Sequence, residues 1–134
     1  MTAADTSPAL DSNLVREFVA NAHGDLGAVR DALAGEPALA NASWDWGGGD
    51  WETGLGAAAH MGRRDIAELL LAHGARLDIF AAAMLGETEV VRAVVAAQPE
   101  VVNGLGPHGI PLRAHAQAGG EQARSVLELL DSAV

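Results

Sequence analysis

Short apolar segments alternate with polar turns along the whole chain, and the apolar positions recur at helical spacing. Within residues 64–73, Ile66, Leu69 and Leu70 follow one another at three- or four-residue intervals or lie side by side. This spacing puts them on one face of a helix, which would pack against a neighbouring element. We expect that helix to end before Gly74, because glycine readily takes the left-handed conformation at a helix C-terminus.

The same pattern recurs around four glycines, Gly24, Gly62, Gly86 and Gly119, each with a short alanine-rich segment before it and an amphipathic segment after it. Segments 24–41 and 86–103 also match each other: each ends in a proline that an asparagine follows four residues later. Self-similarity of this kind indicates stacked structural repeats, and the scarcity of aromatic residues disfavours extended sheet. We therefore predict an all-α fold. The predicted helix N-caps are Asp25, Thr53 and Thr88, and Pro37 and Pro99 are predicted to end the helices before them.

The segment from Thr53 to Ala75 resembles an ankyrin repeat. It contains Gly-Leu-Gly-Ala-Ala-Ala-His and Leu-Leu-Leu-Ala-His-Gly-Ala, where the family has Pro-Leu-His-x-Ala-Ala and Leu-Leu-Leu-x-x-Gly-Ala. Segment 110–119 keeps the family's proline and leucine as Pro111 and Leu112. The resemblance covers roughly residues 14–131 and implies a solenoid of about four helix-turn-helix units with irregular fingers. We expect a flexible N-terminus at 1–13 and a single ankyrin-repeat domain at 14–134, with repeats at about 14–43, 51–78, 79–103 and 109–134 and an insert at 44–50.

The spacing of the four glycines is uneven. Gly86 and Gly119 are 33 residues apart, the ankyrin period, whereas Gly24 and Gly62 are 38 apart and Gly62 and Gly86 only 24. One connection is therefore long, and the next lacks its hairpin finger, which predicts a notch. All three tryptophans lie within the long connection. They either wall a binding pocket, with nearby carboxylates as polar contacts, or pack as filler.

In ankyrin proteins the two positions before each of these glycines face the concave groove. Here they include His23, the His60-Met61 pair and Met84, with His115 on the inner helix of the last repeat and His108 in its finger. These side chains either form an adaptable binding face or lie partly in the core. The candidate binding residues are Trp44, Asp45, Trp46, Asp50, Trp51, Glu52, His60, Met61, Met84, His108 and His115, and no catalytic residue is assigned.

Charge and missing residue types narrow the functions. The net charge is −10, from 18 acidic and 8 basic residues, so nucleic acid and anionic membrane surfaces are unsuitable partners. Cysteine, lysine and tyrosine are absent, and the five histidines show no short metal-ligand spacing, so we expect no metal site and no cofactor. Residues 1–13 lack the apolar run of a signal peptide, and we expect a cytoplasmic protein.

The ankyrin resemblance implies a protein-interaction module that binds an unidentified protein through its concave groove and tryptophan-rich finger. The alternative is a small-molecule-binding protein or a cofactor-independent enzyme of isomerase, cyclase or lyase type. Such an enzyme would use Asp, Glu and His as acids and bases in a pocket beside the insert. The sequence leaves catalytic activity and oligomeric state open.

Overall fold

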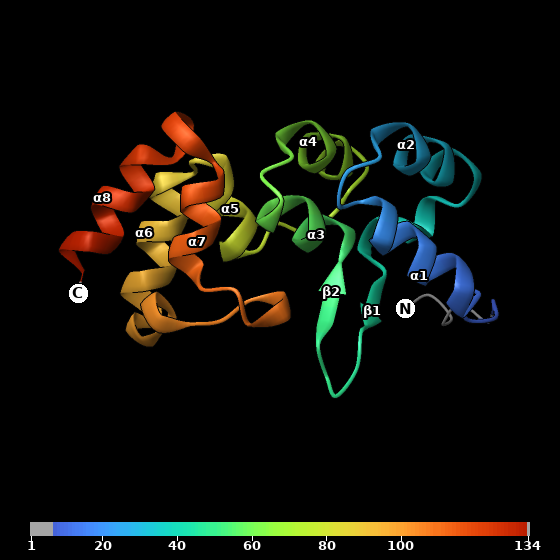
Figure 1. The fold of residues 1–134 in the computed structure, drawn as a ribbon, viewed down its shortest axis with the longest axis horizontal. Helices are drawn as coiled ribbons and strands as arrows, with labels where there is room; N and C mark the ends of the chain where they lie inside the picture. Colours follow the sequence, from blue (N-terminus) through green and yellow to red (C-terminus); the bar gives the residue numbers. More distant parts are fainter. Residues whose placement is uncertain (1–6, 134) are drawn as a thin grey trace, which may run out of the picture.

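Four consecutive pairs of α-helices make up most of the chain in this computed structural model, which describes residues 7–133 (Figure 1). The pairs are α1 (Ser12–Asn21) with α2 (Leu26–Gly35), α3 (Gly54–His60) with α4 (Arg64–Ala72), α5 (Ile79–Leu85) with α6 (Thr88–Ala97), and α7 (Leu112–Ala118) with α8 (Arg124–Ser132). Four 3-10 turns join them: η1 (Pro37–Asn41), η2 (Pro99–Asn103), η3 (Pro107–Gly109) and η4 (Gly120–Ala123). The first helices of successive pairs pack on one another in chain order, α1 on α3, α3 on α5 and α5 on α7. The prediction of a predominantly helical fold is confirmed.

Capping residues explain where several helices begin and end. Asp25 and Thr53 accept hydrogen bonds from the backbone N–H groups of Ala28 and Gly56, as predicted for N-caps. The prediction for Thr88 is wrong, because α6 begins at this residue and the hydroxyl donates to the Gly86 carbonyl instead.

The predicted helix ends agree with the structure. Gly74 follows α4 with a positive φ of 91°. Pro37 and Pro99 come after the ends of α2 and α6 and start 3-10 turns, since proline cannot continue the hydrogen bonding of a preceding helix.

Two clusters of buried apolar residues form the core. The larger one lies between α1, α2, α3 and α4, and the smaller one lies between α5, α6, α7 and α8. Helix α5 belongs to both, since Ala81 and Met84 face the first cluster and Ala82 and Ala83 the second. Alanines on α3 and α5 are fully buried, and their small side chains allow the inner helices to approach closely.

A β-hairpin precedes α3. Its strands β1 (Ser43–Asp45) and β2 (Trp51–Thr53) are antiparallel, with Trp44 opposite Glu52. The turn contains three glycines with positive φ, and one carboxylate oxygen of Asp45 accepts hydrogen bonds from the N–H groups of Gly47 and Gly49. The glycines of the insert therefore serve the turn of the hairpin.

The N-terminal boundary differs slightly from the prediction. Helix α1 begins at Ser12, with Asp11 as its N-cap, so the last two residues of the segment expected to be flexible (1–13) are helical. Residues 1–6 of that segment lie outside the described residues. The insert 44–50 forms the outer part of the hairpin, and α5 follows α4 without a hairpin between them, as the glycine spacing predicts.

Candidate functional site

Three histidines surround one buried carboxylate on the hairpin side of the helices. The Nε2 atoms of His23, His60 and His108 lie 3.2, 3.0 and 3.1 Å from oxygens of Glu52. Each of the four residues offers one ligand atom, and these atoms lie within 4.8 Å of one another. The residues come from four segments: the turn after α1, strand β2, the end of α3 and the loop before α7.

Glu52 occupies the centre of this group because of the short strand that carries it. Side chains alternate along a strand, so Trp51 is exposed while Glu52 points inward and is only 1% exposed. Its Oε1 also accepts a hydrogen bond of 2.8 Å from the indole Nε1 of Trp46. Burial raises the pKa of Glu52, but hydrogen bonds from His60 and Trp46 and the charges of His23 and His108 outweigh it, so the pKa is lowered.

The other ring nitrogens of two histidines are fixed by acceptors. Nδ1 of His23 lies 3.0 Å from the Val19 carbonyl, and Nδ1 of His108 lies 2.7 Å from Oδ2 of Asp50. Carbonyl and carboxylate oxygens only accept, so each Nδ1 carries a hydrogen and donates. In the neutral ring, Nε2 then presents a lone pair toward Glu52. Two lone pairs at this distance repel, so a cation, either a proton or a metal ion, must lie between them.

The loop that carries His108 reaches the hairpin by spanning the predicted notch. Between α4 and α5 there is no hairpin, and residues 104–111 lean toward the first hairpin, on the same side of the helices (Figure 1). The His108 N–H donates to Oδ1 of Asp50 over 2.7 Å, and a side-chain carbon at Gly56 would lie 3.5 Å from Pro107 Cγ. The skipped finger thus leaves room for the later loop to complete the histidine cluster.

His108 adopts a left-handed backbone conformation with φ of 61°, the only positive φ at a non-glycine position among the described residues. Such a conformation costs a non-glycine residue on the order of 1 kcal/mol. Asp50 holds it by accepting from both the backbone and the ring. Burial lowers the pKa of His108, but the hydrogen bond to Asp50 and the charges of Glu52 and Asp50 outweigh it, so the pKa is raised.

The structure brings together five of the residues predicted from the sequence: Trp46, Asp50, Glu52, His60 and His108. Met84 and His115 are buried, the second of the two alternatives considered for these positions, since they are 1% and 0% exposed. Met84 packs in the larger core cluster, and the His115 ring lies 4.9 Å from the Phe80 ring while its Nδ1 pairs with the Pro111 carbonyl.

The remaining predicted residues lie outside the histidine cluster. Trp44 packs against the larger core cluster as filler. Together with Asp45 and Trp51 it also lines a cavity of about 290 Å³ beside α1. Met61 is exposed at the end of α3. The three tryptophans therefore divide between the two roles considered, because Trp44 fills space while Trp46 reaches the histidine cluster.

Sequence reasoning did not select His23 as a site residue. It did place His23 among the positions that precede an aligned glycine, and His60 belongs to the same set. This shared position before an aligned glycine was the signal that could have identified His23 as a site residue. The argument against metal binding from histidine spacing does not hold, since ligands from four separate segments have no short spacing to detect.

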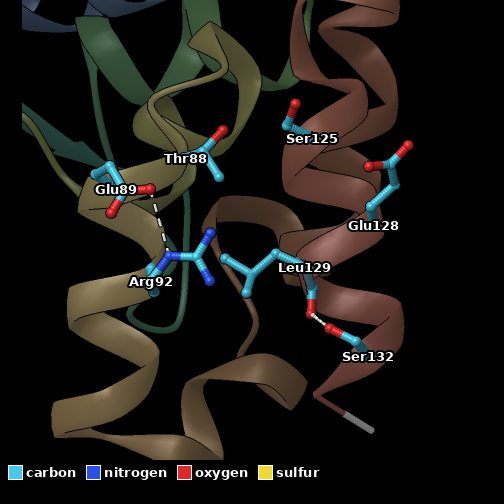
Figure 2. Close-up of a pocket in the computed structure, with 7 residues that line it drawn as sticks. All are labelled: Thr88, Glu89, Arg92, Ser125, Glu128, Leu129 and Ser132. Atoms are coloured by element: carbon cyan, nitrogen blue, oxygen red, sulfur yellow. Dashed lines mark hydrogen bonds and ion pairs between the residues drawn. The ribbon is translucent and has the colours of Figure 1, made fainter.

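A second hollow lies between α6 and α8. These helices are at the opposite end of the stack from α1 and α2 (Figure 1). The hollow has a volume of about 520 Å³ and is lined mainly by polar side chains, among them Thr88, Arg92, Ser125 and Glu128. Arg92 is paired with Glu89 on the same helix, and Ser132 donates to the Leu129 carbonyl (Figure 2). Arg92 and Ser132 are therefore already paired, and no charged group among the described residues of this hollow is buried, so the histidine cluster with its buried carboxylate is the stronger candidate.

Comparison of the chain with known protein families, with curated proteins and with solved structures gives no match. Within residues 7–133, every helix is too short or too polar to cross a bilayer.

Proposed function

We propose that this protein binds one divalent transition-metal ion through His23, Glu52, His60 and His108, on an ankyrin-type repeat scaffold. The observation that carries the metal site is the convergence of three Nε2 atoms on one buried carboxylate. The scaffold proposal draws support from four stacked helix pairs in chain order and from the hairpin between the first two.

The distances in the cluster suit ligands of a single ion. Zinc binds imidazole nitrogen and carboxylate oxygen at about 2.0–2.2 Å, so neighbouring ligand atoms of a tetrahedral zinc ion lie roughly 3.3–3.6 Å apart. The separations of 3.0–3.2 Å between Nε2 atoms and Glu52 oxygens are a little shorter, so small shifts of these side chains would accommodate one ion.

The donor set indicates the class of metal. Imidazole nitrogen suits zinc, iron, copper and nickel, whereas calcium and magnesium prefer oxygen ligands. The hydrogen bonds at Nδ1 of His23 and His108 orient the rings and fix the tautomer with a free Nε2, as in established metal sites.

Calorimetric titration of untagged, EDTA-treated protein with Zn²⁺ and Co²⁺ tests the proposal. We expect one ion per chain, and at least about 100-fold weaker binding in His60→Ala, since second-shell losses alone cost up to this factor. His73→Ala is the matched control, because His73 pairs with the Leu69 carbonyl on α4 and does not belong to the cluster. Equal binding by both variants would contradict the proposal. Failure to bind any metal would favour the acid–base alternative with the same carboxylates and histidines.

A protein partner on the groove side stays a second proposal. Trp51 and Met61 are 61% and 52% exposed, and exposed tryptophan and methionine are common anchors at interfaces. The double variant Trp51→Ala/Met61→Ala should lose capture of a partner from lysate while it keeps its helicity. Unchanged capture would contradict this second proposal.

A further inference from the structure

The two sides of the histidine cluster differ in their access to solvent. Glu52 closes the inner side, since its side chain is fully buried. The side chains of His23 and His108 are 26% and 33% exposed, while that of His60 is 10% exposed. An ion bound by these four residues would therefore be covered by protein from below and open between His23 and His108.

Trp46 borders that opening. Its ring centroid lies 6.3 Å from the His23 ring and 6.3 Å from the His108 ring, and the two histidine rings are 6.1 Å apart. The hydrogen bond from Nε1 to Glu52 fixes the indole in place. The three rings therefore surround the solvent-exposed side of the cluster.

Four protein donors leave coordination positions free on a metal that takes more than four ligands. They complete a tetrahedral zinc site, whereas a five- or six-coordinate ion, such as the non-haem iron of oxygenases, would keep positions for exogenous ligands. Three neutral imidazoles and one carboxylate leave a net charge of +1 on a divalent ion. The carboxylate of Asp50 binds the Nδ1 side of His108, away from the Nε2 that faces the ion.

We propose that the bound metal ion keeps one coordination position open between His23, His108 and Trp46, and that it binds a small anion there. The proposal rests on the proposed metal site. The opening between these three side chains would then be a ligand-binding site for small inorganic anions or for a small carboxylate. Trp46 is a positioning residue, which limits the size of the ligand and contributes no bond to the metal.

Azide titration of the Co²⁺-loaded protein tests this inference by visible absorption, since the d–d bands of cobalt change with coordination number. We expect saturable binding of one azide per cobalt, with a changed d–d spectrum and no release of the ion. An unchanged spectrum, or release of cobalt into solution, would overturn the open position. Absence of cobalt binding before azide is added would instead overturn the proposed function.

Two variants locate the position. Trp46→Ala loses the hydrogen bond to Glu52 and is therefore compared at a cobalt concentration that saturates each protein, where it should change the azide dissociation constant at least about fivefold. Trp51→Ala is the matched control, since Trp51 lies on the opposite face of β2 from Glu52. Equal azide affinities in the two variants would show that the ligand does not enter beside Trp46 and would overturn the assignment.

Discussion

Asp50 affects the cluster through His108 and makes no direct contact with the proposed ion. It accepts from both the backbone N–H and the ring Nδ1 of His108, over 2.7 Å each. The pKa of Asp50 is lowered, most strongly by the backbone hydrogen bond. In Asp50→Asn the amide oxygen can still accept a hydrogen bond from one of these two groups of His108. The negative charge that faces the ring is lost.

We predict that Asp50→Asn weakens Zn²⁺ binding by about 10- to 100-fold, the usual cost of losing an outer-shell carboxylate. Competition with a chelator of known affinity measures the change. Asp31→Asn, on the exposed side of α2, serves as the control. Equal affinities in the two variants would show that Asp50 does not orient His108.

His115 is a buried histidine, and its resistance to protonation makes the free energy of unfolding depend on pH. Burial lowers its pKa most strongly, although the hydrogen bond of Nδ1 to the Pro111 carbonyl opposes this. Its Nε2 has no hydrogen-bond partner among the described residues, so the folded protein resists protonation there. The unfolded chain takes up this proton with a pKa of about 6.5, so the contribution to stability is complete above that pH and declines below it.

We predict that metal-free His115→Leu loses less stability than the parent protein between pH 7 and pH 5. The two proteins differ only at His115, so the difference between their pH profiles isolates this residue. Urea unfolding in EDTA at several pH values measures the free energy of unfolding. Parallel profiles would contradict the prediction.

At the residue scale, the sequence identified Glu52, His60 and His108 as candidates but not which of these side chains point inward. Glu52 was expected as a polar contact of a pocket, and nothing in the sequence indicated that it is buried. Its burial follows from the alternation of side chains along β2, which is established only when β2 pairs with β1 in the hairpin. His115 and Met84 are buried as well, since the His115 ring lies against Phe80 of α5 and Met84 packs in the larger core cluster.

At the element scale, the aligned glycines have different physical roles. Gly62 and Gly86 have positive φ, whereas Gly119 has a φ of −74° and is required by close approach, since a side-chain carbon there would lie 2.1 Å from the Met84 carbonyl oxygen. Each of the repeated glycines lies between the two helices of one pair, but the sequence does not distinguish the two roles.

Gly86 combines both constraints. It has a φ of 78°, and an added side-chain carbon would lie 2.0 Å from the carbonyl oxygen of Gln122. Gly74 has a φ of 91° with open space around it. Alanine substitutions at Gly74 and Gly86 therefore separate the free-energy cost of the left-handed backbone from the cost of packing an added methyl group.

We predict that Gly74→Ala lowers the free energy of unfolding by roughly 1 kcal/mol, the cost of a left-handed alanine. Gly86→Ala should lower it by about 3 kcal/mol or more, because the backbone around η4 must also move. Urea unfolding of both variants measures the difference. Equal losses would mean that α5 and η4 are not packed as described.

The uneven repeat length was readable from the sequence, but its consequence was not. Counting between glycines showed the skipped finger, which the structure confirms. That the loop at 104–111 spans the gap depends on the pairing of His108 with Asp50, 58 positions away in sequence. Long-range pairs of this kind have no local signal, and for the same reason no spacing rule finds the four ligands.

At the scale of the whole molecule, the metal site would join the two core clusters. His23, Glu52 and His60 lie on elements of the larger cluster, whereas His108 lies in the loop before α7, which belongs to the smaller one. Helix α5 is shared by both clusters, and the ion would add a second connection on the hairpin side. Metal binding would then stabilise both halves of the stack.

We predict that Zn²⁺ at about 100 times its dissociation constant stabilises the protein by about 2.7 kcal/mol. This corresponds to a rise of about 10 °C in the melting temperature of a domain of this size. Amide hydrogen exchange tests where the stabilisation acts. In the parent protein, zinc should slow exchange both around α3 and in residues 104–118. In His108→Ala, which keeps the three ligands of the larger cluster, zinc bound at saturating concentration should slow exchange around α3 alone. His108→Ala removes the only proposed ligand from the second half of the chain. If zinc gives residues 104–118 the same protection in both proteins, the ion does not connect the two clusters.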